Sequence, residues 1–283
     1  MKRFALPVVA ILLLAGCAGQ PPVDDLPPAS PPMFAEPGVG ESAALGLVNL
    51  WRVTGAEGEG EETWLRLDAQ EFQLWRDCGM INGSWAATDT IFLGEAWGAM
   101  GDCATDGMPV VGWLNQVVGF AATADGYDLL AADGSVVASL SIDGVPEPIP
   151  TAAEYFAEPP EITAEVRAQF AAPAPLTVEL ESATADALQG TWVSPTIAST
   201  NPHVAFAADG TWTGSDGCNG GSGRWAVDGD GGFLATSGPS TLMFCEGAPI
   251  PSWVAQAASA GFDADGLLHL FNASGNALGS LAR

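Results

Sequence analysis

Four cysteines, Cys78, Cys103, Cys218 and Cys245, are the residues of this chain whose type and spacing point most directly to a chemistry. Four cysteines allow three disulfide pairings, and four thiolates could instead hold a metal ion. A zinc site usually contains cysteines separated by roughly two to four residues, whereas the nearest two here are 25 positions apart. The spacing therefore predicts disulfides and no metal site.

An internal repeat favours one of the three disulfide pairings. One ordered set of residues occurs twice, as Trp51, Cys78, Trp85, Cys103, Trp113, Leu140 and again as Trp192, Cys218, Trp225, Cys245, Trp253, Leu281. The first and last members are 89 positions apart in both sets, and the first cysteine precedes the next tryptophan by 7 in both. The repeat predicts two copies of one domain, each with its own bond, Cys78–Cys103 and Cys218–Cys245.

The fifth cysteine, Cys17, lies in a different context. Lys2 and Arg3 precede 11 mainly apolar residues, 4–14, a stretch too short for a membrane-spanning helix of about 20 residues. The sequence Leu14-Ala15-Gly16-Cys17 that follows resembles the lipobox of bacterial lipoproteins, in which the cysteine becomes lipid-modified. We therefore predict a signal peptide over 1–16, a lipid on Cys17, and a membrane-anchored protein on the extracytoplasmic side of the cell envelope. The alternative is an ordinary secretory signal in which Cys17 is incidental.

The charge of the chain excludes one class of partner. There are 34 acidic and 8 basic residues, a formal charge of −26. Loss of residues 1–16 would remove two bases and no acid, which brings the charge to about −28. Such a surface repels nucleic acid and anionic headgroups. Solubility is the simplest reason for the acidity, and diffuse binding of divalent cations is the alternative.

The elements between these residues indicate an α+β, mostly β fold. Alternating apolar residues and Asp-Gly or Ser-Gly turns predict, in each copy, an antiparallel sheet or open barrel with one helix, over 109–120 or 251–260. A strand is expected at 241–244. We predict a Pro-rich acidic tether over 17–44, domains over 45–143 and 185–283, and a linker over 144–184 that holds a short helix at 162–170 and an edge strand at 177–180.

The second copy resembles a known family. It contains Gly217-Cys218-Asn219, then Gly223-Arg224-Trp225, then Thr241-Leu242-Met243-Phe244-Cys245. These motifs are similar to those of the META domain of bacterial HslJ-like proteins, whose motif residues here are Gly217, Cys218, Asn219, Trp225, Thr241, Met243 and Cys245. The first copy resembles the family less, because Gly79 stands in place of the Asn and Ala99 in place of the Thr. The resemblance implies an envelope protein linked to stress tolerance, including tolerance of some antibiotics, with no agreed catalytic residues to carry over.

The sequence contains no recognised catalytic constellation. The Gly-rich turn 217–223 has no Lys and precedes a strand, unlike a phosphate-binding loop. His203 and His269 have no nucleophile signature nearby. No enzyme activity and no cofactor are therefore expected, and a hydrolase that uses a carboxylate pair is the remaining enzymatic alternative.

The ten tryptophans divide into two groups. The six that recur between the copies are predicted to be core. Trp64, Trp75, Trp97 and Trp212 lack clear counterparts and are the better candidates for an exposed surface that binds a glycan or peptide, but packing is the favoured interpretation for most of them. The sequence thus predicts a non-enzymatic envelope lipoprotein, in stress or antibiotic tolerance or ligand binding, whose partner is an unidentified envelope protein or small ligand. A scaffold in envelope assembly is the alternative.

Overall fold

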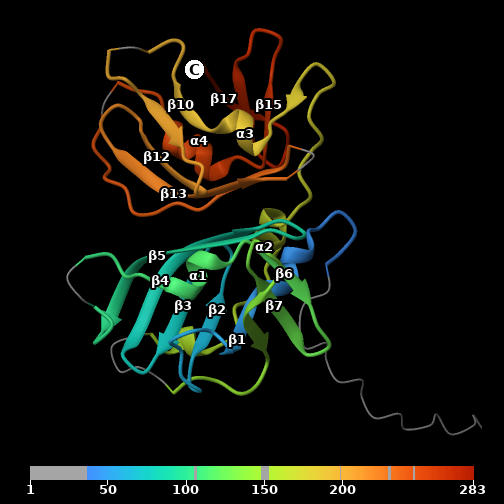
Figure 1. The fold of residues 1–283 in the computed structure, drawn as a ribbon, viewed down its shortest axis with the longest axis vertical. Coiled ribbons are helices and arrows are strands. Elements are labelled where there is room, and N and C mark those ends of the chain that lie inside the picture. The colour runs from blue at the N-terminus through green and yellow to red at the C-terminus, as the bar shows by residue number, and fades with distance from the viewer. Residues whose placement is uncertain (1–36, 105–106, 148–152, 198, 229–230, 245) are drawn as a thin grey trace, which may run out of the picture. The chain divides into compact units, whose positions relative to one another are not determined.

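The structure is a computed structural model that describes residues 37–104, 107–147, 153–197, 199–228, 231–244 and 246–283. By its internal contacts the chain divides into residues 1–31 and 32–283. All described residues belong to the second unit, and Cys17, the signal peptide and most of the tether lie outside them. Within the described unit, one lobe contains the first copy of the repeat and a second lobe contains the other (Figure 1).

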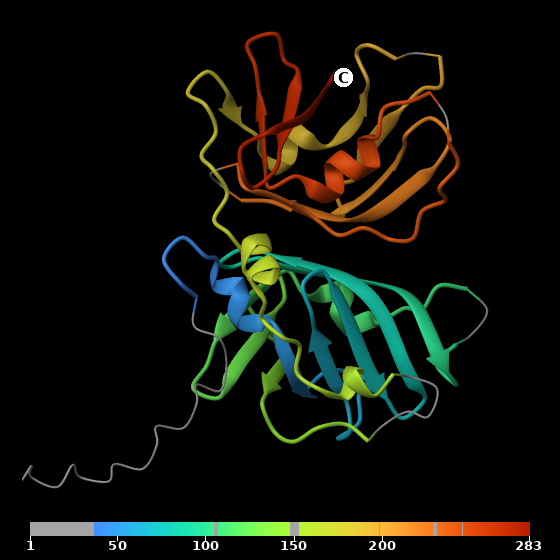
Figure 2. The same ribbon diagram turned by 180° about the vertical axis from the view of Figure 1, so that it is seen from behind.

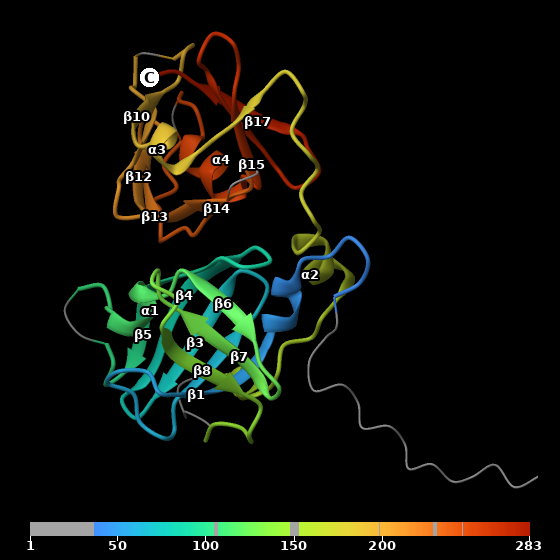
Figure 3. The ribbon, with the colours of Figure 1, turned by 45° about the vertical axis from the view of Figure 1, so that its right-hand side comes forward.

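The N-terminal lobe is one antiparallel sheet of eight strands in the order β5-β4-β3-β2-β1-β8-β7-β6. The strands are β1 (Asn49–Thr54), β2 (Trp64–Leu67), β3 (Glu71–Arg76), β4 (Gly79–Ala87), β5 (Phe92–Gly101), β6 (Gly119–Ala122), β7 (Gly126–Leu130) and β8 (Val136–Ser141). The sheet curls so that its two edge strands approach each other (Figure 3), where a single bridge joins Ile91 to Gly119. This curled sheet agrees with the predicted antiparallel sheet or open barrel.

The C-terminal lobe contains two antiparallel sheets, ordered β10-β11-β12-β13-β14 and β17-β16-β15-β9. The strands are β9 (Glu181–Ser182), β10 (Gly190–Val193), β11 (His203–Phe206), β12 (Thr211–Ser215), β13 (Gly220–Val227), β14 (Phe233–Ala235), β15 (Ser259–Phe262), β16 (Leu268–Phe271) and β17 (Ala277–Leu281). Single bridges join the sheets at both ends, Val193 to Ala282 and Gly232 to Ser259.

The two lobes share one strand order. If β10 to β14 are matched with β1 to β5, and β15 to β17 with β6 to β8, every pair of neighbours among these strands has its counterpart in the other lobe, counting the single bridges, whereas β9, beside β15, has none. The match extends to single hydrogen bonds. The indole N–H of Trp51 donates to the Leu47 carbonyl at 2.7 Å, and that of Trp192 donates to the Leu188 carbonyl at 2.7 Å. The repeated sequence therefore folds twice into the same topology.

The helices are short. They are η1 (Ala43–Leu47), α1 (Gly112–Gln116), η2 (Glu154–Ala157), α2 (Ala164–Gln169), α3 (Ala185–Leu188) and α4 (Ile250–Gln256). The linker helix forms within its predicted range, and α4 packs against the strands β11 to β14 (Figure 2). The prediction of about three helical turns in each copy was wrong, because Gly119–Ala122 and Ser259–Phe262 leave the helix and pair as β6 and β15.

Two predicted strands differ from those in the structure. The edge strand predicted at 177–180 forms slightly later, as β9, which pairs with β15. The strand predicted at 241–244 is absent from the described residues of this segment, because β14 ends at Ala235. The predicted hairpin turns are present, and Gly134, Gly210 and Gly275 have φ of 80°, 78° and 77° there, which glycine adopts without strain.

Each lobe has its own apolar core, in which the repeated tryptophans take part. Trp51, Trp85 and Trp113 are buried in the first, and Trp192 and Trp225 are buried in the second, while Trp253 is half-buried against it. Strand burial follows the expected alternation in β11, where Val204 and Phe206 point inward. In β2, by contrast, every residue is buried.

The burial of β2 on both faces has a visible cause. Part of the linker, residues 154–158, lies over the outer face of the N-terminal sheet, where Phe156 packs on a cluster of Leu50, Trp64, Trp75 and Met80. Arg66 holds this segment against the sheet. Its Nε donates to the Glu158 carbonyl at 3.0 Å, and its guanidinium lies over the rings of Tyr155 and Phe156.

Candidate functional site

The disulfide of the first copy is present. Cys78, in the turn before β4, is bonded to Cys103, just after β5, with their Cα atoms 4.8 Å apart. Cys218 is also disulfide-bonded, and Cys245, its predicted partner, lies outside the described residues. The first pairing is confirmed, and the second stays a prediction.

The Gly217-Cys218-Asn219 turn is built around Asp216. The Asp216 carboxylate accepts the backbone N–H of Cys218 at 2.8 Å and that of Asn219 at 2.6 Å. Partial burial raises the pKa of Asp216, but the hydrogen bonds from Asn219 and Cys218 outweigh it, so the pKa lies below its ordinary value. Gly217 has φ of 108°, and a Cβ there would lie 2.6 Å from the Thr200 hydroxyl oxygen. Only glycine fits this position without a shift of its neighbours.

Asn219 joins this turn to the second family motif. Its side chain is buried, and its Nδ2 donates to the Asp216 carboxylate at 2.8 Å and to the Met243 carbonyl at 2.7 Å. Its Oδ1 accepts the Thr241 hydroxyl at 2.8 Å and the Met243 backbone N–H at 2.7 Å. The amide thus makes the two backbone bonds to Met243 that a neighbouring strand would make. The motif residues Asn219, Thr241 and Met243 form one hydrogen-bonded unit.

This unit holds an apolar segment in solvent. Leu242 is 98% exposed, Met243 60% and Phe244 98%. The three residues form what we call the apolar tip. Large apolar side chains that are individually exposed are common on proteins, but three consecutive ones held by a buried amide form a defined surface feature.

The N-terminal lobe lacks the tip because it lacks the asparagine. Gly79 occupies the equivalent position with φ of 135°, and a Cβ there would lie 2.3 Å from the Met100 carbonyl oxygen. With no side chain in the way, β4 and β5 stay paired as far as Gly79 opposite Gly101, with one shift of register between Asn82 and Gly83. A backbone ladder replaces the side-chain link, so the apolar tip belongs to the C-terminal lobe.

The four tryptophans without counterparts are mostly buried. Trp64, Trp75 and Trp212 are 2%, 3% and 1% exposed, so packing, the favoured interpretation, is confirmed for these three, and they do not form an aromatic binding surface. The indole of Trp212 donates to the Thr236 carbonyl at 2.9 Å. Trp97 alone of the four is half-buried, and it borders a hollow of about 270 Å³ with Ser84 and Pro239.

A polar cluster missed in the sequence joins the lobes. Arg224, next to the motif residue Trp225, donates to the carbonyls of Leu114 at 3.3 Å and Val117 at 3.0 Å, at the C-terminal end of α1. The Thr236 hydroxyl donates to the Glu95 carboxylate at 3.1 Å. Burial raises the pKa of Glu95, against the opposing effects of the Thr236 hydrogen bond and the Arg224 charge. These contacts cross more than 100 positions of sequence, so no local signal could have revealed them.

The histidines take part in local pairs. His269 lies 2.8 Å from the Asp263 carboxylate across β15 and β16, and this hydrogen bond is the main cause of the lowered pKa of Asp263. His203 contacts the Asn201 carbonyl through Nδ1 at 3.0 Å. Both pairs lie within a few residues in sequence, and each has a structural explanation as a turn or strand contact.

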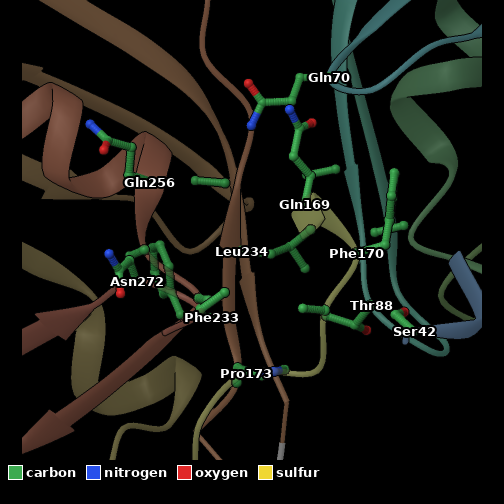
Figure 4. A pocket seen from close by; sticks show the side chains of 18 of the residues that line it. Ser42, Gln70, Thr88, Gln169, Phe170, Pro173, Phe233, Leu234, Gln256 and Asn272 are labelled. Carbon is green, nitrogen blue, oxygen red and sulfur yellow. The ribbon is translucent and has the colours of Figure 1, made fainter. Parts of the chain in front are cut away.

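A cleft of about 560 Å³ lies beside α2, with walls from both lobes (Figure 4). Its lining includes Thr88 from the turn after β4, Gln169 at the end of α2 with the adjacent Phe170, and Leu234 from β14. Its volume is typical of a small-molecule site. The cleft could hold a ligand without any change of fold.

Comparison with known proteins gives one match. The META domain family model matches residues 177–278, which include the turn at Asn219 and the apolar tip. Searches of curated proteins and of solved structures found no match. In the part of the chain that the structure describes, no three His, Cys, Asp or Glu side chains could together hold a metal ion, and no helix is long and apolar enough to cross a membrane. Residues 177–278, the C-terminal copy of the repeat, thus match the META domain family model.

Proposed function

We propose that this protein is a lipid-anchored protein of the bacterial envelope that works by binding and not by catalysis, in tolerance of envelope stress or of antibiotics. The META domain supports a bacterial HslJ-like protein. The lipid anchor, the envelope location and the non-enzymatic action go beyond this family match and are what we propose.

Sequence and structure support the location together. Residues 1–16 read as an export signal and Cys17 as a lipid site. The Cys78–Cys103 disulfide is typical of proteins that mature in an oxidising compartment outside the cytoplasm. A lipid anchor on an exported chain agrees with both observations.

The apolar tip is the observation that carries the binding function. The polar motif residues Asn219 and Thr241 use their side chains to hold Met243 in place, so their role is architectural. Leu242 and Phe244, which they position, face solvent almost completely. Burying one such side chain contributes about 1.5–3 kcal/mol, so a partner that covers the tip gains affinity from residues that do nothing for the fold.

The experiment is a matched pair of surface variants in a strain that lacks the gene for this protein. L242S/F244S should leave the melting temperature unchanged and abolish rescue of growth under envelope stress. The control V39S/V178S removes two equally exposed apolar side chains elsewhere and should rescue growth fully. Full rescue by L242S/F244S would reject the tip as the binding surface.

The tip also favours a second candidate, a scaffold that holds a protein partner in envelope assembly. The two are separated by crosslinking from the tip in intact cells. A photoreactive residue at position 242 that yields one defined protein adduct supports the scaffold, whereas stress rescue without any adduct supports small-ligand binding.

A further inference from the structure

The cleft beside α2 is a preformed space. The segment that precedes η1 and the linker are joined by backbone bonds, Ser42 N–H to the Phe170 carbonyl at 2.7 Å and Ala172 N–H to the Gly40 carbonyl at 2.8 Å. The linker is joined to the C-terminal lobe by Ala174 N–H to the Ala273 carbonyl at 2.9 Å. The Ser84 hydroxyl donates to the Ser237 carbonyl at 2.8 Å on the lining itself. A ligand would therefore not have to order the walls before it binds.

Apolar and polar groups together line the cleft. Phe170, Phe233 and Leu234 contribute ring and alkyl surface, and in Figure 4 Leu234 extends from its strand into the space. The amides of Gln70 and Gln169 lie together at one end. Both residues are exposed, so their side chains can reorient toward a bound molecule.

The charge of the lining has one sign. The charged residues that line the cleft are Glu41, Asp89 and Asp228, and no Lys, Arg or His lines it. Arg167 offsets Glu41 in an ion pair at 2.8 Å. Asp89 accepts the Ala43 backbone N–H, and none of the ion pairs between described residues includes it. The formal charge of −26 adds a negative field around the cleft.

We propose that this cleft binds small organic cations with an apolar body, the apolar part against Phe170 and Leu234 and the positive charge toward Asp89. The site is separate from the apolar tip and does not depend on the function proposed for it. An anion of the same shape is excluded by the same carboxylates.

Two ions of equal shape and opposite charge test this directly. Tetraphenylphosphonium and tetraphenylborate are titrated by calorimetry into the purified full chain carrying Cys17→Ser, which removes the predicted lipid site. We expect one phosphonium per chain, at least about tenfold tighter than the borate. Equal binding of both ions, or of neither, would overturn the proposal.

Gln169 provides the variants, because it is exposed and surface substitutions should leave the fold intact. One charge about 5 Å from the ligand in water changes affinity about fourfold, so Gln169→Glu should tighten and Gln169→Lys should weaken phosphonium binding by about that factor. Gln169→Trp should block it by filling the space. Gln116 on α1 is also exposed and lies outside the lining, so Gln116→Lys should have little effect. If Gln116→Lys weakens binding as much as Gln169→Lys, the ion binds the acidic surface in general and the cleft is not the site.

A last experiment distinguishes binding at the cleft from binding at the apolar tip. L242S/F244S should bind the phosphonium as tightly as the protein with the unmodified tip does, because neither residue lines the cleft. Loss of phosphonium binding in L242S/F244S would place the ion at the tip and overturn the assignment to the cleft.

Discussion

The Asn219 side-chain oxygen accepts the Thr241 hydroxyl at 2.8 Å, and this bond joins two motifs that are 22 residues apart. The same oxygen accepts the Met243 N–H, and the amide nitrogen donates to the Met243 carbonyl. The G-C-N turn and the T-x-M segment are therefore two halves of one structure. The asparagine amide bonds Met243 in place of a neighbouring strand and leaves the adjacent side chains free to face solvent.

The first prediction concerns the strength of this link. Asn219→Ala removes four side-chain hydrogen bonds of about 1 kcal/mol net each, so it should lower the free energy of unfolding by about 4 kcal/mol. Thr241→Val removes one and should cost about 1 kcal/mol. Because both variants break the same bond, the double variant should be less destabilised than the sum of the two. Urea denaturation measures all three.

Thr213→Val is the matched control for this cycle, since Thr213 is exposed on β12 and its change should stay within about 0.5 kcal/mol. Strict additivity of Asn219→Ala and Thr241→Val would show that the two residues act independently, contrary to the geometry.

The second prediction concerns all five cysteines. Mass spectrometry of the protein extracted from membranes should find linked peptides 78/103 and 218/245 and a lipid adduct on Cys17. On the chain-entropy account, a loop of about 26 residues makes each bond worth about 3.5 kcal/mol, so C78A/C103A should unfold at a clearly lower urea concentration. Free thiols at 218 and 245 would contradict the pairing, and an unmodified Cys17 would contradict the anchor.

The topology was largely predictable because the repeat encodes it. Scarce residues at equal spacing fix the order of the elements, and the paired cysteines and the turn glycines Gly134, Gly210 and Gly275 fix where the chain reverses. The lengths of α1 and α4 were not predictable. Residues 119–120 and 259–260 fit a helical pattern equally well, and only pairing with β7 and β16 draws them into strands.

The candidate sites were less predictable because they depend on distant contacts. Thr241 to Phe244 has a strand-like composition, yet its backbone bonds to a side chain 24 residues away. Trp64 and Trp75 are hidden by a linker segment about 90 residues downstream, which Arg66 fastens. Composition shows that such residues are apolar and leaves open what covers them.

The third prediction concerns the linker segment 154–158 that covers Trp75. Trp75→Ala should cost about 3–5 kcal/mol, the range for a buried tryptophan, because it opens the cluster beneath Phe156. Trp97→Ala removes a half-buried ring and should cost about 1 kcal/mol or less. Thermal or urea unfolding compares the two. A Trp75→Ala variant as stable as the parent would mean that residues 154–158 do not cover the sheet in solution.

The fourth prediction is a pH dependence that arises at Glu95. Burial raises the pKa of this carboxyl above the ordinary 4.5, so the folded protein keeps the proton over a pH range in which the unfolded chain has lost it. The contribution of Glu95 to stability is therefore greatest below about 4.5 and declines as pH rises through the folded pKa. Glu95→Gln keeps an oxygen to accept the Thr236 hydroxyl and has no proton to lose. Its stability relative to the parent should rise over that interval and then stay constant.

Urea denaturation of both proteins from about pH 4 to about pH 8 isolates this effect, because the other carboxylates are common to the pair. Thr213→Val, at an exposed position on β12 and without a titratable group, serves as the control and should show a difference that does not change with pH. Arg224 opposes the shift, so Arg224→Met should raise the pKa of Glu95 further and extend the decline to higher pH. A difference between Glu95→Gln and the parent that does not change with pH would mean that Glu95 is solvated in solution, and that Arg224 and Thr236 do not enclose it.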